Sequence, residues 1–337
     1  MIKSRRSQRG IALIIVLMVV AFVAILGTEM GQRLQLQIQR TANIKDSNQA
    51  YWYALGAEQY AKKSIKLLLE QANGVIHLNQ PWSQQFLYPL EGGGIQADLV
   101  DMQSCFNLNA LAQTAASSAN QSTAPNATEI TDAMLAFHRL LLTRELIPEM
   151  DSFTADTVRD SLADWLDKDD NLRSFGAEDV DYESLPAPYL TANTLMVNKS
   201  ELRLVNGVSP QWINVLLPLV CAVPDKGEMR LNVNTITDEQ AAVLAAVTGM
   251  DVDQAQRLIA SRPQDGYQNI SEFMAEPDIE ALSLSTVQQE WFDITTQYFI
   301  LHTKTRYNNA TFSMSSVFYI DDTDNISVVR REFGGKY

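Results

Sequence analysis

The chain opens with two blocks of opposite character. The first ten residues, MIKSRRSQRG, contain four basic residues and no acidic residue, and the next seventeen, Ile11 to Gly27, contain no charge. As a helix this apolar run would span roughly 26 Å, slightly less than the ~30 Å hydrocarbon core of a bilayer. The basic flank predicts that residues 1–10 stay in the cytoplasm while the rest of the chain lies across the membrane. An uncleaved signal anchor is the simplest interpretation of this pattern alone.

The helical pattern continues beyond the apolar run. Residues 28–72 contain no Pro, and their second half places apolar residues at spacings of three and four: Ala54, Ala57, Ala61, Ile65 and Leu68. This spacing puts one apolar stripe on a helix. The sequence therefore predicts a single long helix that starts in the bilayer and ends packed on a folded domain.

Alternating apolar and polar residues near the C-terminus predict strands instead. Three such segments, 296–306, 309–320 and 326–333, are separated by Tyr307-Asn308 and by the turn DDTDN. Residues 95–102 form a fourth candidate strand after a run of three glycines. Together they predict a small antiparallel sheet against the long helix, which is an α+β arrangement.

Between these strands, from about 105 to 290, the pattern is helical. An Ala/Ser/Thr/Asn-rich loop over 110–131 precedes amphipathic segments at 132–144 and 155–166. The segments 200–220 and 241–261 both read as helix, Val-x-Gly turn, helix, with Gly207 and Gly249 at the turns. Such pairs resemble helix-hairpin-helix (SAM-like) units, which elsewhere hold DNA backbones; the simpler interpretation is a packing unit, since these hairpins carry Asp251, Asp253 and Asp265.

The charge balance argues against nucleic acid as a partner. The net charge of −14, together with the four positive charges of the first ten residues, leaves −18 on the remainder. A body of that sign repels phosphates and favours cations. No catalytic motif is present: the chain lacks nucleophile-elbow, zinc-protease and phosphate-loop patterns, and its three histidines are far apart in sequence. We therefore expect a protein that is not an enzyme.

One acidic segment, DWLDKDDNLRSFGAEDVDY (164–182), has metal-ligand spacing. Counting from the first member, carboxylates or amides fall at positions 1, 3, 5 and 12 of an EF-hand-like loop, namely Asp167, Asp169, Asn171 and Glu178. Position 6 is Leu172 rather than the usual Gly, so a standard EF-hand loop is not expected, and a solvated acidic loop is the alternative. A second acidic group (Asp321, Asp322 and Asp324) reads as a surface turn.

The leader and the apolar run resemble the class III signal of type IV pilins and type II secretion pseudopilins. That resemblance implies that a prepilin peptidase cuts between Gly10 and Ile11 and methylates the new amine. The apolar segment then survives as a membrane anchor and as the core of a helical filament. Most pseudopilins carry Glu at the fifth position after the cut, but here that position is Ile15. An unpaired carboxylate in hydrocarbon costs several kcal/mol, so its absence fits a subunit with no neighbour above it.

Lack of this Glu and large size are features of the K minor pseudopilins of type II secretion, and the chain is similar to that family. The resemblance implies a leader (1–10), a transmembrane segment (11–27), a pilin-like α+β domain (28–104 and 290–337) and an inserted α-helical domain (105–289). It also implies that the 164–182 segment binds a structural Ca²⁺, for which we expect Asp167, Asp169, Glu178 and Asp179 as the main ligands and Asn171 and Asp164 as weaker ones. All-oxygen ligation favours Ca²⁺ over Zn²⁺.

By the same resemblance, the chain sits in the inner membrane with its body in the periplasm. It would join the I and J minor pseudopilins in a tip complex that primes the pseudopilus, in contact with other pseudopilins and the inner-membrane assembly platform. Alternatives are a type IV pilus tip adhesin and a membrane-anchored DNA-uptake protein. Export to an oxidising compartment makes a Cys105–Cys221 disulfide the expected pairing; two unpaired buried thiols are the alternative.

Overall fold

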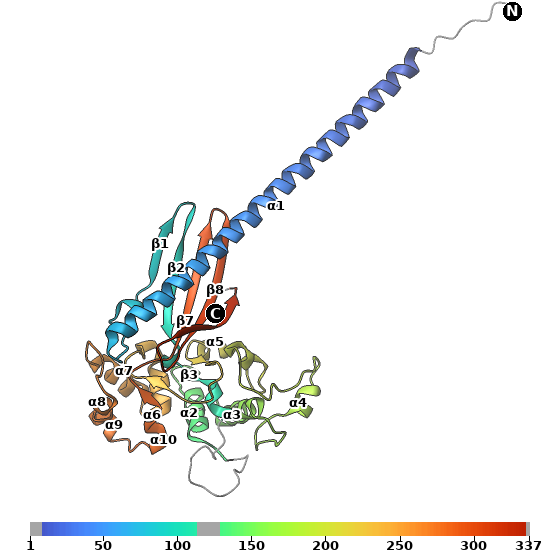
Figure 1. Ribbon diagram of the computed structural model, residues 1–337. Coiled ribbons are helices and arrows are strands. Elements are labelled where there is room, and N and C mark those ends of the chain that lie inside the picture. Colours follow the sequence, from blue (N-terminus) through green and yellow to red (C-terminus); the bar gives the residue numbers. More distant parts are fainter. Residues whose placement is uncertain (1–8, 113–128, 335–337) are drawn as a thin grey trace, which may run out of the picture.

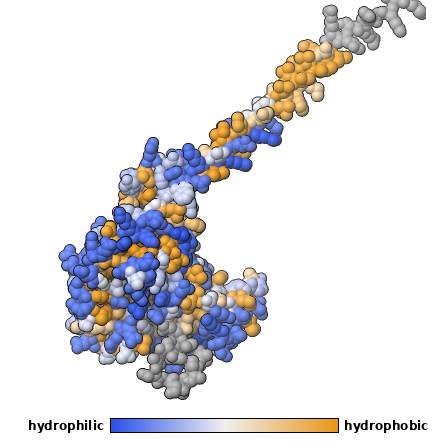
Figure 2. All heavy atoms as spheres, in the orientation of Figure 1, coloured by the Kyte–Doolittle hydropathy of each residue, from blue (hydrophilic) through white to orange (hydrophobic). Residues whose placement is uncertain are grey.

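The long N-terminal helix dominates the molecule. The computed structural model describes residues 9–112 and 129–334, and helix α1 runs unbroken over 64 residues, Arg9–Ala72, as the sequence predicts. Its first forty residues project away from the body, and side chains become buried only from Ala50 onward (Figure 1). Among the described residues one helix, α1, is long and apolar enough to cross a membrane, and that apolar stretch is fully exposed, as the orange spheres of Figure 2 show.

A five-stranded antiparallel sheet packs against the second half of α1. Its order is β1-β2-β7-β8-β9, and the strands are β1 (Phe86–Leu90), β2 (Gly93–Asp101), β7 (Tyr298–Tyr307), β8 (Ala310–Ile320) and β9 (Ile326–Phe333). The last four confirm the predicted strands to within a few residues. The edge strand β1 was not predicted. Its sequence, FLYPL, leaves the central three residues exposed and contains Pro89, so it lacks the alternation that marks a half-buried strand.

Small residues let the helix lie close to the sheet. Ala50, Ala54, Ala57 and Ala61 are buried on the face of α1 that meets the strands. The buried Glu58 bridges three elements: Arg331 donates two hydrogen bonds to its carboxylate, at 2.7 and 2.9 Å, and Ser316 donates a third at 2.7 Å. Burial alone would raise the pKa of Glu58, but these donors hold it below its ordinary value. A charged group thus fixes the helix on the sheet.

The inserted region between β2 and β7 is mainly helical. Its α-helices are α2 (Asp132–Leu141), α3 (Ser152–Leu166), α4 (Asp179–Glu183), α5 (Ile213–Leu216), α6 (Ala241–Thr248), α7 (Val252–Ser261), α8 (Ile270–Met274), α9 (Pro277–Glu280) and α10 (Thr286–Gln289). Short 3₁₀ turns accompany them at η2 (Met102–Ser104), η3 (Leu108–Ala112), η5 (Lys199–Leu204) and η6 (Asp238–Gln240), whereas η1 (Pro81–Ser83) lies outside this region, between α1 and β1. Most of the predicted 110–131 loop lies outside the described residues. The region gathers at the end of the sheet farthest from the membrane segment (Figure 1).

The predicted internal repeat is only half present. Gly249 joins α6 to α7 with φ 84°, and Gly207 also adopts positive φ, at 81°, as expected. The expectation of two α-helices around Gly207 was wrong: a 3₁₀ helix precedes it and the four-residue α5 follows it. Pro210 and Pro218 confine α5, because proline cannot continue a helix interior.

Two short parallel ladders lie at the base of the insertion, and the second of them ties the insertion to the segment that leads into β7. β3 (Phe106–Asn107) pairs with β4 (Val220–Cys221), and β5 (Leu231–Asn232) pairs with β6 (Phe292–Asp293). Just beyond the end of α1, the Ile76 amide donates to the Ile294 carbonyl at 2.9 Å, and Asn232 Nδ2 donates to the Ile76 carbonyl at 3.1 Å. The segment just beyond the long helix is therefore bonded to β5 and to the residue that follows β6.

Candidate metal centre

Helix α3 delivers two carboxylates to the acidic segment. Asp151 caps its N-terminus by accepting a hydrogen bond from the Thr154 amide at 2.9 Å, and Asp167 is the residue at its C-cap. Asp164 and Asp167 therefore lie at the carbonyl end of α3, where the helix dipole disfavours negative charge. A cation nearby would offset both the dipole and the repulsion between the two side chains.

Three carboxylates of this segment are buried without enough hydrogen-bond donors. Asp164, Asp167 and Glu178 are 0, 9 and 6% exposed. Asp164 Oδ1, Asp167 Oδ1 and both Glu178 carboxylate oxygens are buried and receive no hydrogen bond. Buried charges normally need a partner or a metal, because an unpaired carboxylate loses its hydration. The orphaned oxygens fit a hard cation such as Ca²⁺ in chemistry, although these four would need further oxygen ligands to complete its shell of six to eight.

Arg173 supplies the positive charge present among the carboxylates. Its Nε lies 3.2 Å from Asp164 Oδ1 without the alignment of a hydrogen bond, and its Nη2 lies 3.9 Å from Asp167 Oδ2. The Arg173 amide also donates to Asp164 Oδ2 at 3.3 Å. One guanidinium thus faces two aspartates, and Glu178 is left without an ion pair among the described residues.

The pKa values reflect this crowding of buried acids. Burial, and then the neighbouring carboxylates Asp167 and Asp160, raise the pKa of Asp164 to about 7 against the opposing effect of Arg173. Burial and Asp169 raise the pKa of Asp167 to about 6. Burial, followed by the charges of Asp164 and Asp167, raises the pKa of Glu178 to about 7. All three acids resist ionisation in this arrangement, which a bound cation would reverse.

The other expected ligands lie at the rim. Asp169 Oδ1 accepts hydrogen bonds from Asn171, at 3.0 Å from its amide and 2.5 Å from Nδ2. Asp179 is tied to Thr191, whose amide and hydroxyl both donate to Asp179 Oδ1. The structure thus brings Asp164, Asp167 and Glu178 together and places Asp169, Asn171 and Asp179 around them. Asp164, expected to be a weaker ligand, is the most deeply buried; its position three residues before Asp167 on a helix could have indicated this.

No group of three or more His, Cys, Asp and Glu side chains within residues 9–112 and 129–334 is arranged to hold a metal ion as it stands. Gly176 approaches Asp164 Oδ2 so closely that an added Cβ would overlap it. The backbone of the loop therefore lies tightly against this carboxylate, and a Cβ at position 176 would force the Asp164 side chain to move.

The second acidic group is a turn, as predicted. Asp321 Oδ1 accepts hydrogen bonds from the Thr323 amide, the Thr323 hydroxyl and the Asn325 amide at 2.7–3.0 Å. These bonds lower the pKa of Asp321 to about 2. The carboxylate is fully satisfied by its own turn between β8 and β9.

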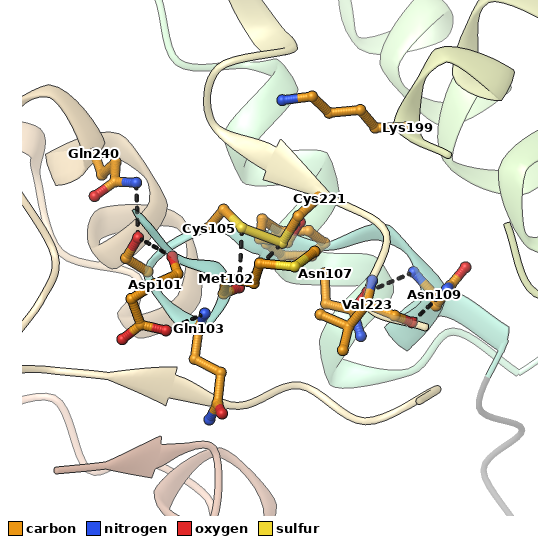
Figure 3. The surroundings of a disulfide bond; sticks show 12 residues. Asp101, Met102, Gln103, Cys105, Asn107, Asn109, Lys199, Cys221, Val223 and Gln240 are labelled. Carbon is orange, nitrogen blue, oxygen red and sulfur yellow. Dashed lines mark hydrogen bonds between the residues drawn. A yellow bond between two sulfur atoms is a disulfide. The ribbon is translucent and has the colours of Figure 1, made fainter. Parts of the chain in front are cut away.

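The two cysteines are bonded to each other at the base of the insertion. Cys105 and Cys221 form a disulfide with their Cα atoms 5.9 Å apart, the pairing expected from the sequence (Figure 3). Close by, the fully buried Asp101 accepts hydrogen bonds from Thr235, Asn232 and Thr296, which belong to the insertion and its exit. Burial raises the pKa of Asp101 to about 6. Sequence patterns gave no signal for this buried polar junction.

The N-terminal features occupy the start of α1. Gly10 and Ile11 lie in the first turn of the helix, while residues 1–8 of the leader lie outside the described part of the chain. A long helix with an exposed apolar half, a five-stranded sheet packed on its second half and a large helical insertion are the features of a pilin-like subunit.

Comparison with known proteins identifies the family to which this pilin-like chain belongs. Two models described as "Type II secretion system (T2SS), protein K" match residues 104–225 and 231–295. Type II secretion system protein K of Aeromonas hydrophila is 35% identical over 341 residues, which cover 98% of this chain and 99% of that protein. The protein K of Klebsiella pneumoniae is 32% identical over 330 residues, 97% of each chain. The chain belongs to the type II secretion system protein K family.

A solved structure extends the similarity to the fold. A chain in the crystal structure of the GspK-GspI-GspJ complex from the type II secretion system of enterotoxigenic Escherichia coli matches with a TM-score of 0.75 and 28% identity. The match covers 88% of this chain and 100% of that chain. Membership of this family makes the chain a pseudopilin, a structural component of a secretion system and not an enzyme.

Proposed function

We propose that this pseudopilin caps the tip of the type II secretion pseudopilus, together with I-type and J-type minor pseudopilins, and primes its assembly for the export of folded proteins. The observation that carries this proposal is the match to a chain solved in complex with GspI and GspJ. The position of the insertion supports it: the helical region covers the end of the sheet opposite the membrane segment, where a further subunit would otherwise stack (Figure 1). Ile15, in place of the usual Glu, fits a subunit with no neighbour above it.

Co-expression tests this role. The full chain should co-purify with the I-type and J-type proteins of the same secretion system as one complex, and immunogold labelling should find it at filament ends. Labelling along the length of pseudopili, or failure to associate with either partner, would refute the proposal.

The membrane topology follows from the N-terminus. We infer that a prepilin peptidase cuts between Gly10 and Ile11 and methylates the new amine, leaving α1 in the inner membrane and the body in the periplasm. The exposed apolar half of α1 and the basic leader support this orientation. Mass spectrometry of the mature protein should find N-methylated Ile11 at its start; an intact Met1 or a cut beyond residue 20 would refute it.

We further propose that the acidic segment binds a structural Ca²⁺. Asp164, Asp167 and Glu178 would hold the ion through their unbonded oxygens, with Asp169, Asn171 and Asp179 completing the ligand set from the rim. The ion would neutralise carboxylates that now share the single guanidinium of Arg173. Its role would be to order the loop between α3 and α4, because the charges of that loop otherwise repel one another.

The α6–α7 pair supports a helix-hairpin-helix assignment for one of the two repeats. Gly249 supplies the left-handed turn, and all eight residues of α6 are buried. We propose that this unit serves packing, because a helix buried on all sides has no face left for a DNA backbone and the body is strongly acidic.

A further inference from the structure

Three apolar side chains lie exposed together on the inserted region. Phe153, near the start of α3, is 67% exposed, and its ring meets that of Phe175 edge-on with the ring centroids 5.7 Å apart. Phe175 is itself 40% exposed, and Ile130, which is 47% exposed, lines the same small cavity as Phe175. Exposed apolar side chains that cluster in this way are typical of interaction sites, whereas single ones are common everywhere on a surface. We call these three residues the α3 patch.

Hydrogen bonds hold the α3 patch in place. The Phe175 amide donates to Asp160 Oδ2 at 3.2 Å, and the Ser161 hydroxyl donates to the Phe175 carbonyl at 3.5 Å, so α3 fixes the loop segment that carries this ring. Arg173 Nη1 donates to the Glu129 carbonyl at 3.4 Å, which fixes the segment that enters α2. A surface that is already ordered costs a partner little conformational entropy on binding.

The cavity in the α3 patch has the size of a side chain. Its volume is about 100 Å³; Ile130 and Phe175 lie at its edge, and Arg159, Asp160 and Arg173 also line it. Sites for cofactors and small molecules usually enclose roughly 300–1,000 Å³, so this cavity is too small for such a ligand. A cavity of this size beside exposed aromatic rings instead suits one apolar side chain of another protein, the arrangement in which interface anchors are found.

The surroundings of the α3 patch are negatively charged. Each of the two buried arginines in the cavity is paired with two aspartates. Seven acids lie beside the patch or in the adjoining metal centre: Glu129, Asp151, Asp156, Asp160, Asp164, Asp167 and Glu178. When all seven are ionised, they and the two arginines leave a charge of −5, and the proposed Ca²⁺ would leave −3. In either state the patch favours a positively charged partner, and an exposed aromatic ring attracts a cation to its face as well.

We propose that the α3 patch docks a segment of another polypeptide in which basic residues flank an aliphatic side chain. The aliphatic side chain fills the cavity between Ile130 and Phe175, a lysine or arginine lies over the exposed ring of Phe153, and the surrounding carboxylates attract the segment. This adds a recognition surface to the insertion, at the end of the molecule farthest from the membrane segment (Figure 1). The proposal holds with or without Ca²⁺ in the acidic segment, because the charge is negative in both states.

A labelled peptide tests the α3 patch. Full-length protein in a nonionic detergent, at pH 8 and ~50 mM salt, should bind the fluorescein-labelled peptide GRRLRRG, as followed by fluorescence anisotropy. Phe153→Ala should weaken binding about tenfold, and Phe153→Tyr should change it less than about twofold, because the ring is kept. The matched control Phe333→Ala removes another exposed phenylalanine, 62% exposed on β9, and should also change binding less than about twofold. The peptide GRRGRRG, which lacks the aliphatic side chain, should bind several-fold more weakly to wild type.

The contrary results are equally clear. No saturable binding of GRRLRRG to wild type up to ~1 mM peptide would overturn the proposal. An unchanged affinity for Phe153→Ala, or an equal loss in Phe333→Ala, would show only a general attraction to the acidic body and would overturn the assignment of this surface. Binding of the charge-reversed peptide GEELEEG as tightly as GRRLRRG would rule out a basic partner. Circular dichroism of Phe153→Ala should match wild type, because this side chain lies at the surface.

Discussion

Without the Ca²⁺ that we propose for the acidic segment, the stability of the folded chain should fall as the pH rises. Asp164 has its pKa raised from 3.8 to about 7 in the folded state. Between those values the native chain binds more protons than the unfolded chain, so the free energy of unfolding decreases as pH rises and reaches its low level above about pH 7. At about 1.4 kcal/mol for each pH unit, this carboxylate alone accounts for about 4 kcal/mol. The pKa values of Asp167 and Glu178 are also raised, but these groups are coupled to Asp164. Their contributions to the free energy of unfolding therefore do not simply add to that of Asp164.

Bound Ca²⁺ should abolish this fall. The ion binds the ionised carboxylates, and at a concentration of about 1,000 times its Kd it stabilises the native state by about 4 kcal/mol. At 2–4 °C per kcal/mol, we expect the chelator-treated protein to melt roughly 10 °C below the calcium-loaded protein at pH 8 and close to it at pH 5. Thermal melts of the full chain in detergent, with and without chelator, measure the difference.

Asp164→Asn separates calcium binding from ordinary packing. In chelator at pH 8 the variant should be more stable than wild type, because it removes a buried charge; in calcium it should lose most of the gain in melting temperature. Asp324→Asn, an exposed acid of the β8–β9 turn, is the matched control and should alter neither result. A wild-type melting temperature in chelator that is constant or rises from pH 5 to 8, or an equal loss for Asp164→Asn in both buffers, would refute this reasoning.

Other changes probe the leader, the loop and the disulfide. Gly10→Phe should block processing, so that mass spectrometry finds the leader still attached; a normal mature N-terminus would contradict the pilin pathway. Gly176→Ala should displace Asp164 and remove the calcium-dependent gain in melting temperature, and an unchanged gain would show that the loop tolerates the methyl group. The double variant Cys105→Ser/Cys221→Ser should lower the free energy of unfolding by about 2–5 kcal/mol in urea titrations, with an unaltered midpoint as the contrary result.

How far the sequence predicts this fold depends on whether a pattern is local. Buried and exposed residues alternate along strands β7, β8 and β9 because one face of the sheet meets α1. That period of two can be seen in the amino-acid sequence. The sequence of β1 shows no such alternation, because this edge strand has an exposed centre and therefore no buried face that would select apolar residues at every second position. The prediction of a long helix after Gly207 failed for a different reason. The turn at Gly207 is present, but the prolines that follow it in sequence shorten the next helix.

The same distinction applies to the candidate metal centre. Spacing indicated Asp167 and Glu178, because ligands from one loop must recur at fixed intervals. The depth of Asp164 and the presence of Arg173 between the carboxylates depend on how α3 packs in the insertion, which the loop sequence does not encode. The Asp101 junction joins residues up to 195 positions apart, so no local pattern could reveal it.

The hydrogen bonds just beyond α1 tie the long helix to a second part of the molecule besides the sheet. Ile76 is bonded to Asn232 of β5 and to Ile294, the residue after β6, so the end of the 64-residue helix is held by the base of the insertion as well as by the sheet. The Cys105–Cys221 bond closes that base covalently. The long helix and the insertion are therefore joined at one place, where the chain leaves α1, rather than through the sheet alone.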